Sequence, residues 1–251
     1  MKYFKIFLSV MVMALAFQGA MAQEVLDSLE IIYNQILNGE EVENVGQKPD
    51  VQPEESTSQR ILVFGDSMLD GVGRRFNDYA SANGHTIFTS IWYGSTTKSW
   101  AYTTELDRLL QKVNPTFVVV CLGTNDLGYR DISSRSAAVK EIMRVLGDIP
   151  FVWIGPVTLR NIKQDPGIVN MIRENVGVDR FYDSYHLKLA RFPDGIHPTF
   201  EASARWVDGV VTWMNSPEFA YRVHFNRPSS SVPFKNYETH STRYKGTQKG
   251  L

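Results

Sequence analysis

The sequence predicts an α/β protein with a five-stranded parallel sheet and helices on both of its faces. Short apolar segments alternate five times with longer segments of helical spacing. Strands that are apolar at every position are typical of parallel sheets, because crossover helices cover both faces of such a sheet. With 251 residues, 43% of them hydrophobic and 21% charged, the chain is long enough to bury one full core.

The alternation defines each expected element in order. The expected strands are 60–64, 86–92, 116–122, 151–154 and 180–182. The expected helices are 69–82, 100–112, 136–146, 168–176 and 199–214. If the strand order is 2-1-3-4-5, a crevice opens between the carboxyl ends of the first and third strands. Ser67 follows the first strand and Asn125 follows the third, so we expect the chemistry there.

The segments before residue 60 predict an export signal and a solvated linker. Two lysines precede the apolar stretch 6–17, and Ala20-Met21-Ala22 offers a signal peptidase site, so residues 1–22 are expected to be removed after Ala22. Residues 23–59 combine an amphipathic helix with an acidic linker. The apolar stretch is short for a membrane span, which favours a secreted or periplasmic protein without stable membrane insertion.

The folded domain is expected over 60–215, followed by a basic C-terminal extension over 216–251. Apolar residues alternate over 219–225 and predict a strand-like strap on the domain. From Ser229 onward the pattern disappears, so we expect a mobile tail and a catalytic unit confined to 61–214.

Charge and cysteine content exclude several function classes. The net charge of −1 provides no basic field for nucleic acid. The single cysteine, Cys121, lies in an apolar run and has no intramolecular partner. The sequence therefore predicts no disulfide and no cysteine zinc site.

Ser67 is the candidate nucleophile. It sits in Gly65-Asp66-Ser67, between an expected strand and an expected helix. The N-terminus of a helix supplies unpaired N–H groups and the positive end of a dipole, which an oxyanion requires. The alternative is that Asp66 and Ser67 only cap the helix.

A serine nucleophile needs a neutral imidazole as base and a carboxylate that orients it. Two histidines follow an aspartate by three residues, giving the pairs Asp183/His186 and Asp194/His197. Gly195 and Pro198 make the second pair part of a tight turn, which can fold the carboxylate onto the ring. We therefore favour His197, and interpret His186 as an ordinary surface or packing residue.

Four sequence blocks resemble those of the SGNH, or GDSL-type, hydrolases. They are Gly65-Asp66-Ser67, Gly94 in Tyr93-Gly94-Ser95, Gly123-Thr124-Asn125-Asp126, and Asp194-Gly195-Ile196-His197-Pro198. The resemblance covers about 61–214 and implies a flavodoxin-like three-layer fold and ester hydrolysis through an acyl-enzyme. It implies Ser67 as nucleophile, His197 as base, Asp194 as its orienting carboxylate, and an oxyanion hole of Ser67, Gly94 and Asn125. No metal or cofactor is implied.

Aromatic residues near the blocks favour a carbohydrate substrate, because flat apolar rings stack on sugars. They are Trp92, Tyr93, Trp100, Tyr102 and Tyr129, of which Trp92, Tyr93 and Tyr129 are the predicted substrate-binding residues. Together with export, they indicate an acetylesterase acting on an envelope glycan. The alternatives are a lysophospholipase- or thioesterase-type lipid esterase, an envelope O-acetyltransferase, and a non-catalytic binding module.

Overall fold

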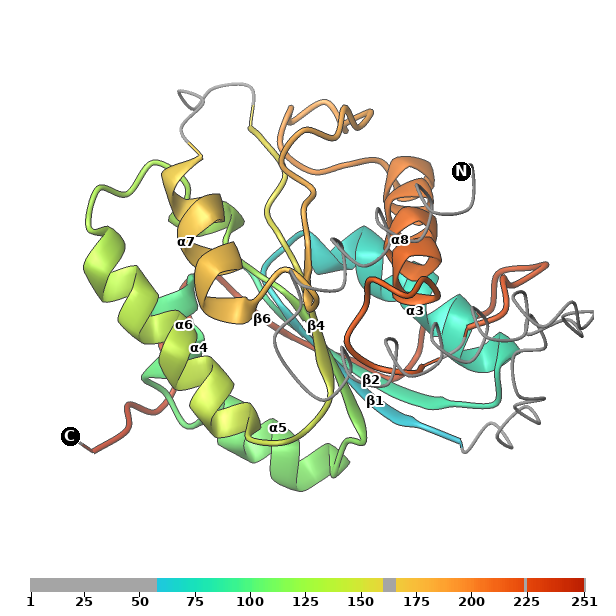
Figure 1. Cartoon of the computed structure of the whole chain (residues 1–251), viewed down its shortest axis with the longest axis horizontal. Helices are drawn as coiled ribbons and strands as arrows, with labels where there is room; N and C mark the ends of the chain where they lie inside the picture. The colour runs from blue at the N-terminus through green and yellow to red at the C-terminus, as the bar shows by residue number, and fades with distance from the viewer. Residues whose placement is uncertain (1–57, 160–165, 224, 251) are drawn as a thin grey trace, which may run out of the picture. The chain divides into compact units, whose positions relative to one another are not determined.

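A six-stranded parallel sheet forms the centre of the part of the chain that this computed structural model describes, namely residues 58–159, 166–223 and 225–250. The strand order is β5-β4-β3-β1-β2-β6 (Figure 1). The strands are β1 Arg60–Gly65, β2 Thr86–Trp92, β3 Phe117–Cys121, β4 Phe151–Ile154, β5 Phe181–Tyr182 and β6 Tyr237–His240. The α/β class, the parallel sheet and the predicted order of the first five strands are confirmed, and a sixth strand is added.

Helices cover both faces of the sheet. They are α3 Leu69–Ala82, α4 Thr97–Ala101, α5 Glu105–Val113, α6 Ile132–Leu146, α7 Gly167–Val176 and α8 Phe200–Met214, with a 3-10 turn, η1, at Thr124–Asp126. Helices α3 and α8 pack on one face, and α4 to α7 pack on the other (Figure 1). This is the three-layer arrangement that the resemblance implies.

Strand β1 lies inside the sheet, between β3 and β2, and this position explains why residues 61–64 are all apolar. Leu62 and Phe64 belong to the core cluster under α4 to α7, whereas Ile61 and Val63 belong to the cluster under α3 and α8. All four side chains are fully buried. Successive strand residues point to opposite faces, so a strand covered on both sides needs apolar residues at every position.

The helix expected over 100–112 is instead two helices, α4 and α5. The break falls at Thr103 and Thr104, where the backbone N–H of Thr104 donates to the carbonyl of Thr247 at 2.8 Å. The hydroxyl of Thr103 donates to the carbonyl of Ser99 at 2.7 Å. A contact with a distant part of the chain thus interrupts a helix that the local pattern would have continued.

The expectation of a mobile tail after Ser229 is wrong. Strand β6, from Tyr237 to His240, pairs in parallel with β2, and the segment after it contacts α4 and α5. Phe219 and Phe225 of the extension are 4% and 2% exposed, in the core cluster under α3 and α8. The C-terminal extension is therefore part of the folded α/β domain.

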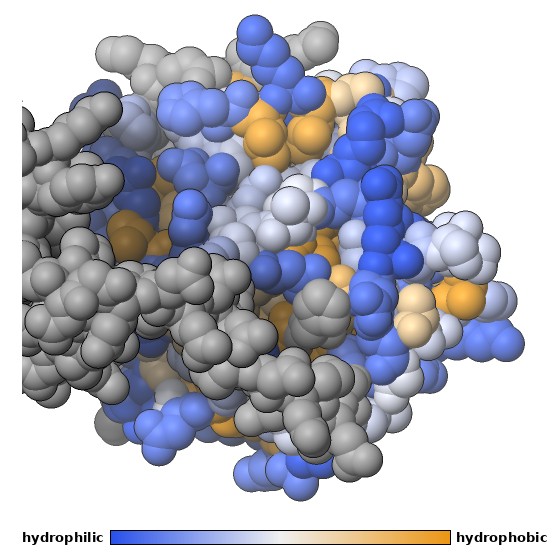
Figure 2. Space-filling model, turned by 45° about the vertical axis from the view of Figure 1, so that its right-hand side comes forward, coloured by the Kyte–Doolittle hydropathy of each residue, from blue (hydrophilic) through white to orange (hydrophobic). Residues whose placement is uncertain are grey.

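The predicted signal peptide and most of the acidic linker lie outside the described residues. No helix in the described part of the chain is long and apolar enough to cross a bilayer. On the uncovered part of the face in Figure 2, apolar residues form small separate patches among polar ones. Large apolar residues that are more than 40% exposed, within the described ranges, are Tyr129, Val178, Ile196, Phe200 and Tyr237.

Candidate active site

The turn that carries Ser67 follows the central strand β1. At its start, Gly65 lies against strand β3, where a Cβ on this residue would sit only 1.8 Å from the carbonyl oxygen of Cys121. Only glycine fits so close an approach of two strands. The carboxylate of Asp66 then accepts from the N–H of Met68 at 3.0 Å, and helix α3 begins at Leu69. Ser67 is thereby held at the carboxyl edge of the sheet.

The second turn, Asp194 to His197, comes just before α8 and holds its own histidine. One carboxylate oxygen of Asp194 accepts from the N–H groups of Ile196 and His197, at 2.8 and 2.9 Å. The other lies 2.8 Å from Nδ1 of His197. These bonds lower the pKa of Asp194 to about 2, the bond to the imidazole contributing most. The carboxylate is therefore ionised at neutral pH and can accept a hydrogen bond from Nδ1–H of His197.

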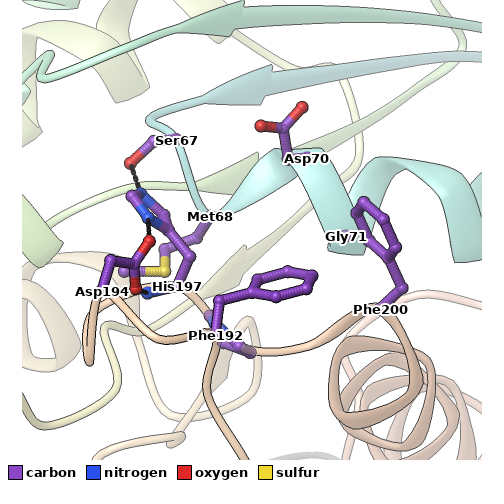
Figure 3. A pocket seen from close by; sticks show the side chains of 9 residues that line it. Ser67, Met68, Asp70, Gly71, Phe192, Asp194, His197 and Phe200 are labelled. Carbon is purple, nitrogen blue, oxygen red and sulfur yellow. Dashed lines mark hydrogen bonds and ion pairs between the residues drawn. The ribbon is translucent and has the colours of Figure 1, made fainter.

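The two turns meet at the imidazole. Nε2 of His197 lies 2.8 Å from Oγ of Ser67, which completes a continuous Ser67–His197–Asp194 array (Figure 3). With Nδ1–H directed at Asp194, Nε2 carries the lone pair that can accept the hydroxyl proton. This is the geometry that activates a serine.

The competing pair, Asp183 and His186, does not line the cleft that opens at Ser67 and His197. His186 is exposed with its ring against Tyr185, at 5.2 Å between centroids. The carboxylate of Asp183 accepts from the N–H of Tyr185 and lies 3.5 Å from Arg173. This pair thus has structural contacts of its own.

The predicted oxyanion groups follow three neighbouring strands, β2, β1 and β3. Gly94 has a φ of +71°, a conformation that favours glycine. The side-chain amide of Asn125 donates to the carbonyl of Ser95 at 2.9 Å. An amide nitrogen has two hydrogens, so a second one remains to donate to a substrate.

A buried ion pair supports this side of the site. The carboxylate of Asp126 accepts from the backbone N–H and the hydroxyl of Thr97, at 2.9 and 3.0 Å. Arg135 of α6 lies 2.8 Å from the same carboxylate. Asp126 is fully buried and Arg135 nearly so. These contacts connect the start of α4 and helix α6 to the turn η1 that follows β3.

Asp66 is also fully buried beside the nucleophile. Burial raises its pKa from an ordinary value of 3.8 to about 7, and the nearby Asp126 acts in the same direction. A substantial fraction of Asp66 is therefore protonated at neutral pH, which limits the negative charge close to Ser67.

A cleft of about 170 Å³ opens at Ser67 and His197. Its walls include Met68, Asp70, Phe192 and Phe200 (Figure 3). The rings of the two phenylalanines meet edge to face at 5.3 Å. Neither was predicted, although both flank the Asp194–His197 block in the sequence, which is the signal that could have identified them.

The predicted substrate-binding aromatics occupy different places. The prediction that Trp92 binds substrate at the surface is wrong, because Trp92 is 3% exposed and packs against Trp100 in the core. The hydroxyl of Tyr93 donates to Asp70, which lines the cleft, at 2.9 Å. Burial and this bond raise the pKa of Tyr93 to about 12. Tyr129 is 51% exposed, lies under the guanidinium of Arg135 and does not line the cleft.

One group of side chains among the described residues has the spacing of a metal site: Glu105, Glu238 and His240. The carboxylate of Glu238 also forms ion pairs with Arg108 and Lys112, and Glu105 pairs with Arg108. Two cationic side chains therefore already neutralise these two carboxylates, and the group fits a structural charge cluster better than a metal centre.

Comparison with known proteins matches the chain only at the level of three-dimensional structure. No family model and no curated protein matches it. TesA matches 63% of this chain and 99% of its own, at 19% identity and a TM-score of 0.47. An acetyl xylan esterase, AlAXEase, matches 61% of this chain and 98% of its own, at 14% identity and a TM-score of 0.46.

A third structure, BT4096, is a gut microbial diltiazem-metabolizing enzyme that matches 63% of this chain at 16% identity, with a TM-score of 0.44. The match spans only 47% of that protein. At these identities such matches concern the fold alone. The fold class therefore rests on the sheet itself, which is parallel, is covered by helices on both faces and contains the 2-1-3-4-5 strand order expected from the sequence.

Proposed function

We propose that this chain is an exported serine ester hydrolase of the SGNH type that removes short acyl groups, chiefly acetyl, from a carbohydrate or cell-envelope glycan. The observation that carries the proposal is the contact of 2.8 Å between Ser67 Oγ and His197 Nε2, with Asp194 at 2.8 Å from the other ring nitrogen. A serine that only caps a helix would need neither the imidazole of His197 nor the carboxylate of Asp194.

In the proposed mechanism, His197 takes the proton of Ser67 as Oγ attacks the ester carbonyl. The negative charge on the tetrahedral intermediate is stabilised by the N–H groups of Ser67 and Gly94 and by the amide of Asn125. The alcohol leaves with the proton from His197, and the acyl group stays on Ser67. His197 then deprotonates a water molecule, which attacks the acyl-enzyme and releases the carboxylic acid.

The size of the cleft supports a short acyl group. Its volume of about 170 Å³ is close to that of an engineered cavity in another protein that binds benzene, about 150 Å³. An acetyl group fits such a space, and a long fatty acyl chain would extend beyond it. The ring of Phe200 is 51% exposed and has the guanidinium of Arg74 over one face, so its other face is the apolar surface on which a sugar could stack.

Substitution of the array tests the catalytic proposal. We expect Ser67→Ala and His197→Ala each to lower kcat for p-nitrophenyl acetate by roughly 10³-fold or more, and the double variant to lose little beyond either one, because such residues act as a unit. His186→Ala is the matched control and should retain wild-type activity. Loss of activity in His186→Ala, with retention in His197→Ala, would overturn the assignment.

A panel of acyl chain lengths and acetylated glycans tests the substrate proposal. We expect kcat/KM to fall from acetyl to octanoyl esters, because the volume of the cleft suits a short acyl group. A preference for long acyl chains would favour the lipid-esterase alternative. Acyl transfer to an added sugar in preference to water would favour the O-acetyltransferase, and an inactive chain that binds glycans would favour the binding module.

A further inference from the structure

The loop that carries Gly94 contacts the C-terminal part of the chain at its start, and the short helix α4 that follows the loop contacts it at its far end. We call residues 93–96, between β2 and α4, the oxyanion loop, and residues 237–249 the C-terminal strap. The strap begins with β6 at the edge of the sheet and continues past the oxyanion loop to the junction of α4 and α5 (Figure 1).

At the start of the oxyanion loop, strand β6 extends the ladder beyond the last residue of β2. Trp92 is in register with His240, and the N–H of Tyr93 donates to the carbonyl of His240 at 2.9 Å. Thr242 lies directly beside Gly94, since a Cβ on this glycine would meet the methyl group of Thr242 at 3.3 Å. The strap therefore contacts the backbone whose N–H group is proposed to bind the oxyanion.

Beyond the oxyanion loop, the strap binds the α4–α5 junction. The backbone N–H of Thr104 donates to Thr247 at 2.8 Å, and that of Lys249 donates to Tyr102 at 2.9 Å. Thr103 and Gln248 form an antiparallel bridge. These are the contacts that separate α4 from α5, and they fix the position of the short helix that follows the oxyanion loop.

Side chains anchor the strap to the same region. The ring of Tyr244 stacks on His240 at 4.2 Å and meets the ring of Trp92 at 5.1 Å, and its hydroxyl donates to Glu105. Glu238 pairs with Arg108 and Lys112 of α5. The ammonium group of Lys249 lies 3.0 Å from Asp107 and 3.4 Å from Glu141.

We propose that the C-terminal strap positions the oxyanion loop, so that Thr242 and Tyr244 act as positioning residues for the stabilisation of the tetrahedral intermediate. The inference rests on the proposed function, because it concerns the oxyanion role of Gly94. Small displacements of such a donor have large effects: a misplacement of about 1 Å can lower a rate by about 10²-fold. None of these contacts of the strap involves Ser67 or His197, so the strap should affect the oxyanion side alone.

The test uses the full chain with Tyr244→Ala, which removes the ring that packs on Trp92. We expect kcat for p-nitrophenyl acetate to fall roughly 10-fold or more with little change in KM, as for an interaction made mainly in the transition state. A boronic acid that forms a tetrahedral adduct with Ser67 should lose affinity by a similar factor, since its oxygen occupies the same hole. Thr242→Ala should change both quantities in the same direction.

Val210→Ala is the control for a general loss of stability, because this fully buried residue lies in the second half of α8. It should lower Tm and leave kcat and boronic acid affinity close to wild type. If Tyr244→Ala does not fold, the double variant Tyr244→Phe/Lys249→Met removes two anchors without emptying the core and replaces it in the test.

Two results would overturn the inference. One is a folded strap variant that keeps wild-type kcat and boronic acid affinity. The other is an equal loss of both quantities in Val210→Ala. Failure of the proposed function is a separate outcome, in which Ser67→Ala hydrolyses the ester as fast as the wild type.

Discussion

The two sides of the candidate active site are built in opposite ways. The Asp194–His197 turn makes its carboxylate contacts within four consecutive residues, and its side chains are partly exposed. The oxyanion loop is instead held by Asn125 in the turn after β3 and by the C-terminal strap, which are distant from it in sequence, and Arg135 of α6 in turn pairs with Asp126 of that turn. The base side is thus a local motif, and the oxyanion side depends on the whole fold. Substitutions on the base side should therefore lower activity with little loss of stability, whereas substitutions on the oxyanion side should lower both.

The largest effect on activity is expected for Asp194→Asn, on the local side. The amide has one acceptor oxygen instead of two, so it cannot accept from the backbone N–H groups and from Nδ1 at the same time, and it has no charge to stabilise the imidazolium. The equivalent change in another serine triad lowers kcat about 10⁴-fold. Because Asp194 is on the surface, Tm should change little. Steady-state kinetics and thermal unfolding check both statements, with Asp148→Asn, another exposed aspartate, as the control. A large fall in Tm would contradict the view that this turn is structurally independent.

On the oxyanion side, Arg135→Met should cost stability as well as activity. The change leaves the carboxylate of Asp126 buried without its cation, and breaking a buried ion pair typically costs about 3–5 kcal/mol of unfolding free energy. Arg144→Met breaks an exposed pair with Glu141 and is the matched control, worth about 0–1 kcal/mol. Denaturant unfolding measures both. Equal losses in the two variants would show that Asp126 does not depend on Arg135.

Asn125→Ala should lower kcat by roughly 10²–10³-fold, the usual effect of losing one oxyanion donor. KM for a small ester should stay nearly constant, because the donor acts mainly in the transition state. The contact with Ser95 is lost too, so a modest decrease in Tm is expected. Unchanged kcat in a folded Asn125→Ala variant would remove this residue from the proposed oxyanion hole.

The smallest effect concerns Asp66 and pH. Its pKa of about 7 in the folded chain lies above the ordinary value of 3.8, so the folded chain holds the proton more tightly than the unfolded chain. The stability that this proton contributes is complete below about pH 4 and is lost as the pH rises through about 7. Between pH 5 and pH 8, Tm should therefore decrease less in Asp66→Asn than in the wild type. An identical pH dependence in wild type and variant would contradict the raised pKa.

The local side of the site was also the part that the sequence predicted best. Ser67 after an apolar strand, and a histidine three residues after an aspartate in a Gly-Pro turn, are patterns that short segments determine. Strand β6 was missed because Tyr-Glu-Thr-His is short and polar, and it becomes a strand only by pairing with the edge of β2. The division of α4 from α5 was missed for the same reason, since Thr247 is far from Thr104 in sequence.

Burial caused the remaining error among the site residues. Trp92 stands next to the Gly94 block, which favoured a role at the surface, but it is the last residue of β2 and points into the core. Phe192 and Phe200 line the cleft instead, on either side of the His197 turn. Nearness in sequence to a motif does not specify the direction of a side chain when the neighbouring element is a buried strand.

Strand β6 also determines which edge the sheet presents to other molecules. It pairs with β2 although the two are about 150 residues apart in the chain, so forming this contact costs more loop-closure entropy than forming a local one. Until it forms, the longest strand of the sheet is an open edge with unpaired N–H and C=O groups, which favours pairing between chains. The four residues of β6, with the charged Glu238 among them, cover the last four residues of β2, from Thr89 to Trp92. Protection against aggregation is thus completed only when the polypeptide extends through His240.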